Sequence, residues 1–170
     1  MRHALSLIAI GLVLTGCGST EPNATPYVSA VVAGSPWRGS GPDAELVYTV
    51  DAPDGAGMWT AIASRPLGST SELLSLSLPN PPAPGTYAVD GATAHATFAT
   101  CPTQTIADCA FWTAVPGDPG QLEIIAVDTA ARLIEGTFSF HGHFLGDSAG
   151  PVTVVSNGRF RIRLATSPTW

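Results

Sequence analysis

The stretch most suggestive of chemistry is a short glycine-flanked serine motif late in the chain. Residues 146–151 read Gly-Asp-Ser-Ala-Gly-Pro, which fits the pattern G-x-S-x-G with Ser148 as the nucleophile. A serine hydroxyl attacks a carbonyl only when a base takes its proton and a carboxylate orients that base. His95, followed by Asp108 or Asp118, stands in an order that such a triad can have. Serine hydrolysis is therefore one hypothesis for this protein.

The same motif resembles the nucleophile motif of trypsin-like proteases, and residues 93–96 are similar to the histidine motif of that family. The resemblance implies a triad between two complete β-barrels, yet only 52 residues lie between His95 and Ser148. Ala149 also stands where that motif has glycine. In a hydrolase elbow a helix follows the serine, whereas a strand is expected after Pro151. We therefore expect residues 146–150 to form a loop between two strands, without a catalytic role.

A second candidate is the pair His141 and His143, since an H-x-H pair on one strand face can chelate a metal. The two histidines alternate with Phe140 and Phe144, so the aromatic rings should point inward and the imidazoles toward solvent. We therefore expect exposed polar side chains here rather than a metal site. No motif in the chain calls for a cofactor.

Three arginines, Arg159, Arg161 and Arg163, alternate with apolar residues and form an expected basic stripe. The alternation in their own strands places Glu123 and Glu135 on the same face as this stripe, so they are expected to pair with the arginines from neighbouring strands. The alternative is that the stripe binds an anion or a polysaccharide. The tryptophans should pack in the core or at sheet edges, with a carbohydrate-stacking platform as the alternative: Trp37, Trp59 and Trp112.

The chain starts with a short basic end and an apolar run, residues 4–14, and then turns polar, as in a secretory signal peptide. Residues 14–17 (Leu-Thr-Gly-Cys) resemble the lipobox of bacterial lipoproteins. This resemblance implies removal of residues 1–16 and acylation of Cys17. Gly18, rather than Asp, after the cysteine implies a lipid-anchored protein of the bacterial cell envelope, at the outer membrane.

The remaining chain divides into a tether, one domain and a tail. Residues 17–26 form the lipidated tether, of which residues 18–26 reach at most about 30 Å when extended. Residues 27–165 have the length of a single domain, and residues 166–170 follow as a C-terminal tail.

The charge balance narrows the possible partners. The net charge is −6 and the chain contains no lysine, so we expect no nucleic-acid partner and repulsion from anionic lipid headgroups. The membrane should therefore hold the protein through acyl chains on Cys17, and a protein or glycan partner is unidentified. Once lipid has taken Cys17, Cys101 and Cys109 remain as an even pair and are expected to form a disulfide at the mouth of a hairpin.

Alternating apolar and polar residues dominate from Tyr27 onward and predict short strands with one buried face. About ten such strands, with frequent turns and no helical periodicity, predict an all-β antiparallel sandwich, with a closed antiparallel barrel as the alternative. Asn157-Gly158 predicts a hairpin turn within residues 152–164. One shared core is expected to contain Ile134, Phe138, Phe140, Phe160, Ile162 and Leu164.

Gly136–Phe140 (G-T-F-S-F) and Asn157–Phe160 (N-G-R-F) resemble a pattern of uncharacterised secreted all-β lipoproteins, which also carry a G-T-Y motif, here Gly85–Tyr87. The resemblance implies a fold and no activity. We therefore expect a non-enzymatic binding or structural domain, with a serine hydrolase using Ser148 as the alternative.

Overall fold

The computed structural model describes residues 25–40, 45–49, 58–102, 106–146 and 149–164, and these ranges are almost entirely β-strand. Residues 1–24, which include the expected signal peptide and Cys17, lie outside the described residues, as do Ser148 and residues 165–170. The strands are β1 (Tyr27–Val32), β2 (Ser35–Ser40), β3 (Glu45–Thr49), β4 (Met58–Leu67), β5 (Thr70–Leu78), β6 (Gly85–Val89), β7 (His95–Cys101), β8 (Ala110–Thr113), β9 (Gly120–Asp128), β10 (Leu133–Phe144) and β11 (Val152–Leu164).

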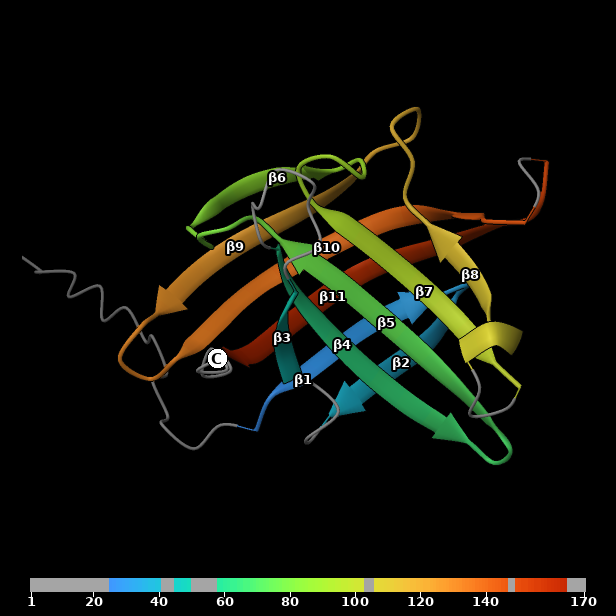
Figure 1. Ribbon diagram of the computed structural model, residues 1–170, viewed down its shortest axis with the longest axis horizontal. Helices are drawn as coiled ribbons and strands as arrows, with labels where there is room; N and C mark the ends of the chain where they lie inside the picture. The colour runs from blue at the N-terminus through green and yellow to red at the C-terminus, as the bar shows by residue number, and fades with distance from the viewer. Residues whose placement is uncertain (1–24, 41–44, 50–57, 103–105, 147–148, 165–170) are drawn as a thin grey trace, which may run out of the picture.

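All eleven described strands belong to one hydrogen-bonded sheet, in the order β2-β1-β11-β3-β4-β5-β7-β8-β10-β9-β6. An additional pairing of β10 with β11 links strands from distant places in this order, so the sheet becomes a nearly closed barrel. In Figure 1, β4, β5 and β7 cross in front of β1, β10 and β11, and the core lies between these layers. Strands β1 and β2 extend the barrel beyond β11, and β9 and β6 extend it beyond β10.

The expected all-β fold is confirmed, and of the two expected arrangements the barrel describes the connectivity. The expectation that every pair is antiparallel is wrong at one point, because β3 runs parallel to β11. The closed ring consists of β11, β3, β4, β5, β7, β8 and β10. An odd number of strands cannot alternate in direction all the way round, so one neighbouring pair must be parallel.

Helical structure in the described ranges is confined to a 3-10 turn, Ile106–Asp108. None of these ranges contains a helix with the length and apolar character to cross a membrane.

Strands β10 and β11 form the central hairpin, and their faces follow the alternation in the sequence. Ile134, Phe138, Phe140, Phe160 and Ile162 are all buried, as expected. The rings of Phe138 and Phe160 lie with centroids 6.4 Å apart. The side chain of Leu164 lies outside the described residues. Successive side chains of a strand point to opposite faces of the sheet, so the arginines between these apolar residues of β11 point outward.

The prediction of a hairpin turn at Asn157-Gly158 is wrong, because β11 continues through these residues. The register with β10 shifts here from Phe138–Gly158 to Phe140–Val155, which is a β-bulge. Asn157 has a φ of 51°, a left-handed conformation that asparagine tolerates better than most residues. A side chain at Gly158 would collide with the ring and carbonyl of Phe138. The Asn-Gly pair therefore bends a strand around the core instead of reversing the chain.

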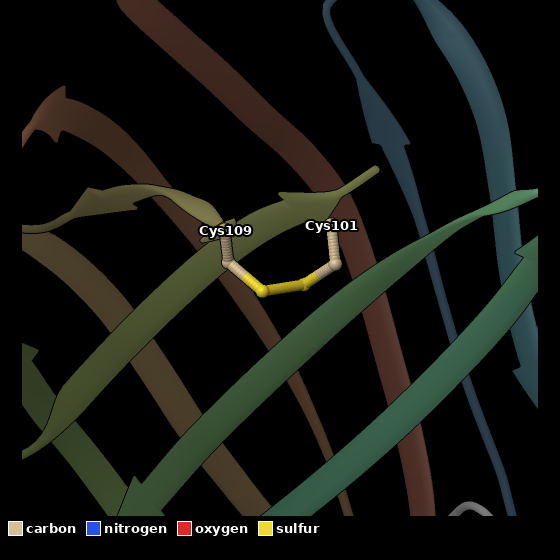
Figure 2. Close-up of a disulfide and its surroundings, with 2 residues drawn as sticks. All are labelled: Cys101 and Cys109. Carbon is tan, nitrogen blue, oxygen red and sulfur yellow. A yellow bond between two sulfur atoms is a disulfide. The ribbon is translucent and has the colours of Figure 1, made fainter. Parts of the chain in front are cut away.

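The predicted disulfide between Cys101 and Cys109 is present, with an S–S distance of 2.03 Å (Figure 2). It joins the end of β7 to the residue before β8, and these strands pair antiparallel from Thr97–Thr113 to Thr100–Ala110. The bridge therefore joins the two strands at the loop end of the β7–β8 hairpin.

Candidate functional site

Three side chains with donor or acceptor groups meet on the outer face of the sheet: Asp118, His141 and His143. The Oδ2 atom of Asp118 lies 2.9 Å from Nδ1 of His141 and 3.2 Å from Nε2 of His143. The side chains of Asp118 and His141 keep 43% and 50% of their exposure, and that of His143 keeps 30%. One carboxylate oxygen thus contacts both imidazoles at a surface open to solvent.

The strands explain how these residues meet. His141 and His143 point outward from β10 because the intervening Gly142 and the preceding Phe140 face inward and are buried. Asp118 comes from the turn between β8 and β9, where its backbone N–H donates to the carbonyl of Val115. β8 pairs with the end of β10 through Thr113 and His143, and β9 pairs with its first half. The turn between them is therefore held beside the histidines.

Hydrogen bonds from His141 and, next, His143 lower the pKa of Asp118 below its ordinary value. A carboxylate in this position is ionised at neutral pH and holds the turn against β10. No set of three potential ligands among the described residues is arranged to hold a metal ion. In this structure the cluster is a hydrogen-bonded clamp.

Two adjoining hollows lie on the outer face beside this clamp. The first, about 670 Å³, is bounded by Asp118 and His141 and by Thr86 and Ala88 of β6. The second, about 540 Å³, reaches Glu123 and Arg159. Both are lined by Gln121, Ser139 and Ser156, which lie on three adjacent strands. We call the two hollows together the outer groove.

The outer groove presents neutral hydrogen-bonding side chains together with apolar surface, and apolar surface predominates in the first hollow. The lining hydroxyl and amide side chains are Thr86, Tyr87, Gln121, Thr137, Ser139, Ser156 and Asn157. Charged groups stand at its two ends, with Asp118 at one and Glu123 and Arg159 at the other. Behind the sheet, the core of the described residues contains no buried polar or charged residue. The outer groove is therefore a shallow surface of mixed polar and apolar character above an apolar core.

The triad considered from the sequence is not assembled around His95. The carboxylate of Asp118 contacts His141 and His143 instead. His95 begins β7 and lies near Asp90, whose pKa is lowered mainly by the backbone N–H of Thr93 and only slightly by His95. Asp108 lies in the 3-10 turn near the disulfide. Ser148 lies outside the described residues.

The tryptophans do not form a common platform. Trp37 on β2 is 2% exposed and belongs to the core. The Nε1 of Trp59 on β4 donates to the side chain of Asn80 at 3.1 Å. Trp112 on β8 packs against two phenylalanine rings, with centroid distances of 6.0 Å to Phe98 and 5.6 Å to Phe144. These placements agree with the expected core and edge packing.

The basic stripe faces outward, as expected, and one predicted acidic partner reaches it. Nε of Arg161 lies 2.6 Å from Oε1 of Glu135, an ion pair without hydrogen-bond alignment. Glu123 instead accepts a long hydrogen bond of 3.4 Å from the hydroxyl of Thr137. Thr137 stands between Glu123 and Arg159 in the register, so this glutamate is one strand too far away.

No local sequence pattern predicts the clamp, because Asp118 precedes His141 by 23 residues and His143 by 25. The H-x-H spacing and the Pro-Gly-Asp turn were both visible in the sequence. Asp118 comes close to the two histidines only because β8 and β9 both pair with β10.

No protein-family model matches this chain, and comparisons with the curated proteins and with the solved structures also found no match.

Proposed function

We propose that this protein is a lipoprotein of the bacterial cell envelope whose β domain is a non-enzymatic binding module, with the outer groove as its binding surface. Acyl chains on Cys17 hold it at the outer membrane, as the lipobox-like residues 14–17 suggest. The observation that carries the binding role is the run of neutral hydroxyl and amide groups along the outer groove. The ligand is an extended polar chain, a glycan strand or a peptide, laid across β9, β10 and β11.

Two features support binding at this place. Apart from Asp118 and Pro119 in the β8–β9 turn, the groove residues project from paired strands, so their positions are set by the sheet. The apolar core beneath provides stiffness, so a ligand would meet groups that are already arranged and would lose less binding free energy to ordering.

A variant that fills the groove tests the binding role. Ser139→Trp places an indole where the two hollows meet, and Ser75→Trp places the same side chain on the outer face of β5. Fractionated envelope glycans and peptides would be passed over the immobilised proteins. We expect wild type and Ser75→Trp to retain the same component and Ser139→Trp to lose it. Equal retention by Ser139→Trp would refute the assignment to the outer groove.

The anchor has a separate test. Cells grown with a labelled fatty acid should incorporate the label into the wild-type protein and not into Cys17→Ala, because only the thiol and amino group of a processed cysteine take acyl chains. Unlabelled wild-type protein would disprove the anchoring, whatever the groove binds.

Hydrolysis by Ser148 is the second candidate, and one contact favours it. The Asp118 oxygen at Nδ1 of His141 leaves Nε2 of that ring free, as in a serine triad. We expect no labelling of Ser148 by a fluorophosphonate probe, because the same oxygen also contacts His143. Stoichiometric labelling that is abolished by His95→Ala or His141→Ala would favour the hydrolase instead.

A further inference from the structure

The arginines of this acidic protein are unevenly distributed. The chain has seven basic residues and a net charge of −6, yet Arg38, Arg159, Arg161 and Arg163 lie on one face of the sheet. In the register, Ser29 of β1 stands between Arg38 and Arg159, and Tyr27 pairs with Arg161. We call these four arginines the basic face.

Two of the four arginines of the basic face have no carboxylate partner among the described side chains. Arg161 is paired with Glu135, and the guanidinium of Arg38 lies 4.8 Å from the centroid of the Tyr27 ring. Arg38 and Arg159 are exposed and form no ion pair with the described side chains. Arg163 is also exposed, but it stands beside Glu45 of β3 in the register, and the side chain of Glu45 lies outside the described residues. Two guanidinium groups, those of Arg38 and Arg159, thus remain available for an anion, and guanidinium geometry matches phosphate oxygens.

The basic face lies where the tether enters the domain. β1 begins at Tyr27, directly beside Arg161 and Arg38. Arg159 and Arg163 lie four residues apart on β11, which is about 13 Å along a strand. The tether of residues 18–26 spans at most about 30 Å. A domain held at Cys17 can therefore lay this face on the surface of the membrane that holds it.

We infer that the basic face docks on the phosphate groups of anionic lipid headgroups in the membrane to which Cys17 is anchored. This inference rests on the proposed anchoring. The net negative charge of the protein alone predicts repulsion from such a surface. Salt, however, screens electrostatic interactions beyond about 10 Å, so the charges nearest the membrane determine whether the domain is attracted or repelled. Docking in this way would fix the orientation of the domain and leave the half of the groove that lies beside Asp118 and His141 free for a ligand.

Arginine footprinting on the lipidated protein tests the inference. The protein would be reconstituted into vesicles of phosphatidylcholine, or of an equal mixture of phosphatidylcholine and phosphatidylglycerol. Phenylglyoxal, which modifies free guanidinium groups, would then be added and each arginine followed by mass spectrometry. In the anionic vesicles we expect Arg38 and Arg159 to react about fivefold more slowly, as for one arginine near an anionic surface. About 1 M salt should abolish this protection.

Two matched variants separate the basic face from net charge. Ser29→Glu puts a carboxylate between Arg38 and Arg159, whereas Ser75→Glu makes the same change in charge on β5. Both serines are half-buried strand residues, so both variants should fold. We expect Ser29→Glu to lose the lipid-dependent protection and Ser75→Glu to keep it.

Three results would overturn the inference, and they are distinguishable. Intact Cys17 acylation with equal arginine reactivity in both vesicle types would refute docking and leave the anchoring in place. The same protection by inorganic phosphate added to phosphatidylcholine vesicles would make the basic face a site for soluble anions. A mass spectrum without acyl groups on Cys17 would remove the proposed anchor and the inference with it.

Discussion

At the scale of single residues, the alternation in β11 separates side chains that stabilise the core from side chains that face solvent. Phe160 is 1% exposed and packs on Phe138, whereas Arg161, its neighbour in the chain, points outward to Glu135. Phe160→Ala should lower the free energy of unfolding by about 3–5 kcal/mol through lost burial and a cavity. Arg161→Ala should lower it by about 1 kcal/mol or less. Equal losses in urea denaturation would mean that the faces are assigned wrongly.

Asp118 should contribute to stability in a way that depends on pH. Its pKa is lower in the folded state than its ordinary value of 3.8, so the folded state binds the proton less tightly than the unfolded chain does. Its stabilisation is therefore present above pH 4 and disappears as the pH falls through the lowered pKa. Urea midpoints of wild type and Asp118→Asn should differ at pH 6 and converge as the pH falls through the lowered pKa of Asp118.

The two histidines provide the control for this effect. Their hydrogen bonds are the main cause of the lowered pKa, so Asp118→Asn should have no such pH-dependent effect in a His141→Ala, His143→Ala background. A pH dependence that persists there would assign the shift to other groups.

At the scale of the elements, the disulfide and the close strand contacts should contribute separately to stability. Cys101 and Cys109 are eight residues apart, and closing a loop of this size should stabilise the fold by about 2–3 kcal/mol on the chain-entropy model. The double variant Cys101→Ala, Cys109→Ala should lose that amount in urea denaturation. Two free thiols in non-reduced protein from the periplasm would disprove the bridge.

Gly136 of β10 should be intolerant of any side chain. A Cβ atom there would collide with the ring of Phe160 and the backbone carbonyl of Glu123, and a carbonyl held in a strand cannot move aside. Gly136→Ala should therefore cost about 3 kcal/mol or more of unfolding free energy. Gly117→Ala is the matched control, because nothing lies within 4 Å of its added Cβ, and it should cost little. Similar midpoints for both variants would disprove the close contact.

At the scale of the whole molecule, one sheet wraps one core, so the domain should unfold as a unit. Phe98 of β7 and Phe138 of β10 lie on strands separated by β8 and belong to the same buried cluster. Phe98→Ala and Phe138→Ala should each lower the urea midpoint of a single transition, followed alike by circular dichroism and tryptophan fluorescence. Two separate transitions in either variant would divide the domain into independent parts.

The sequence by itself determined which residues face inward on each strand, because alternation with a period of two assigns the faces whatever the partner strands are. The buried Phe138, Phe140 and Phe160 and the outward Arg161 follow from this local rule. The disulfide between Cys101 and Cys109 was likewise predicted, on the expectation that Cys17, the third cysteine, carries lipid and leaves these two as a pair.

Only the tertiary structure decided which distant residues meet. Asn157-Gly158 has the chemistry of a turn and of a bulge alike, and the long pairing of β11 with β10 selects the bulge. Asp118 reaches His141 and His143 because β8 and β9 both pair with β10, a long-range choice that no local pattern encodes. The parallel β3–β11 pair follows from closing a ring with an odd number of strands. The candidate site therefore depends on which strands pair in the sheet and not on local sequence preferences.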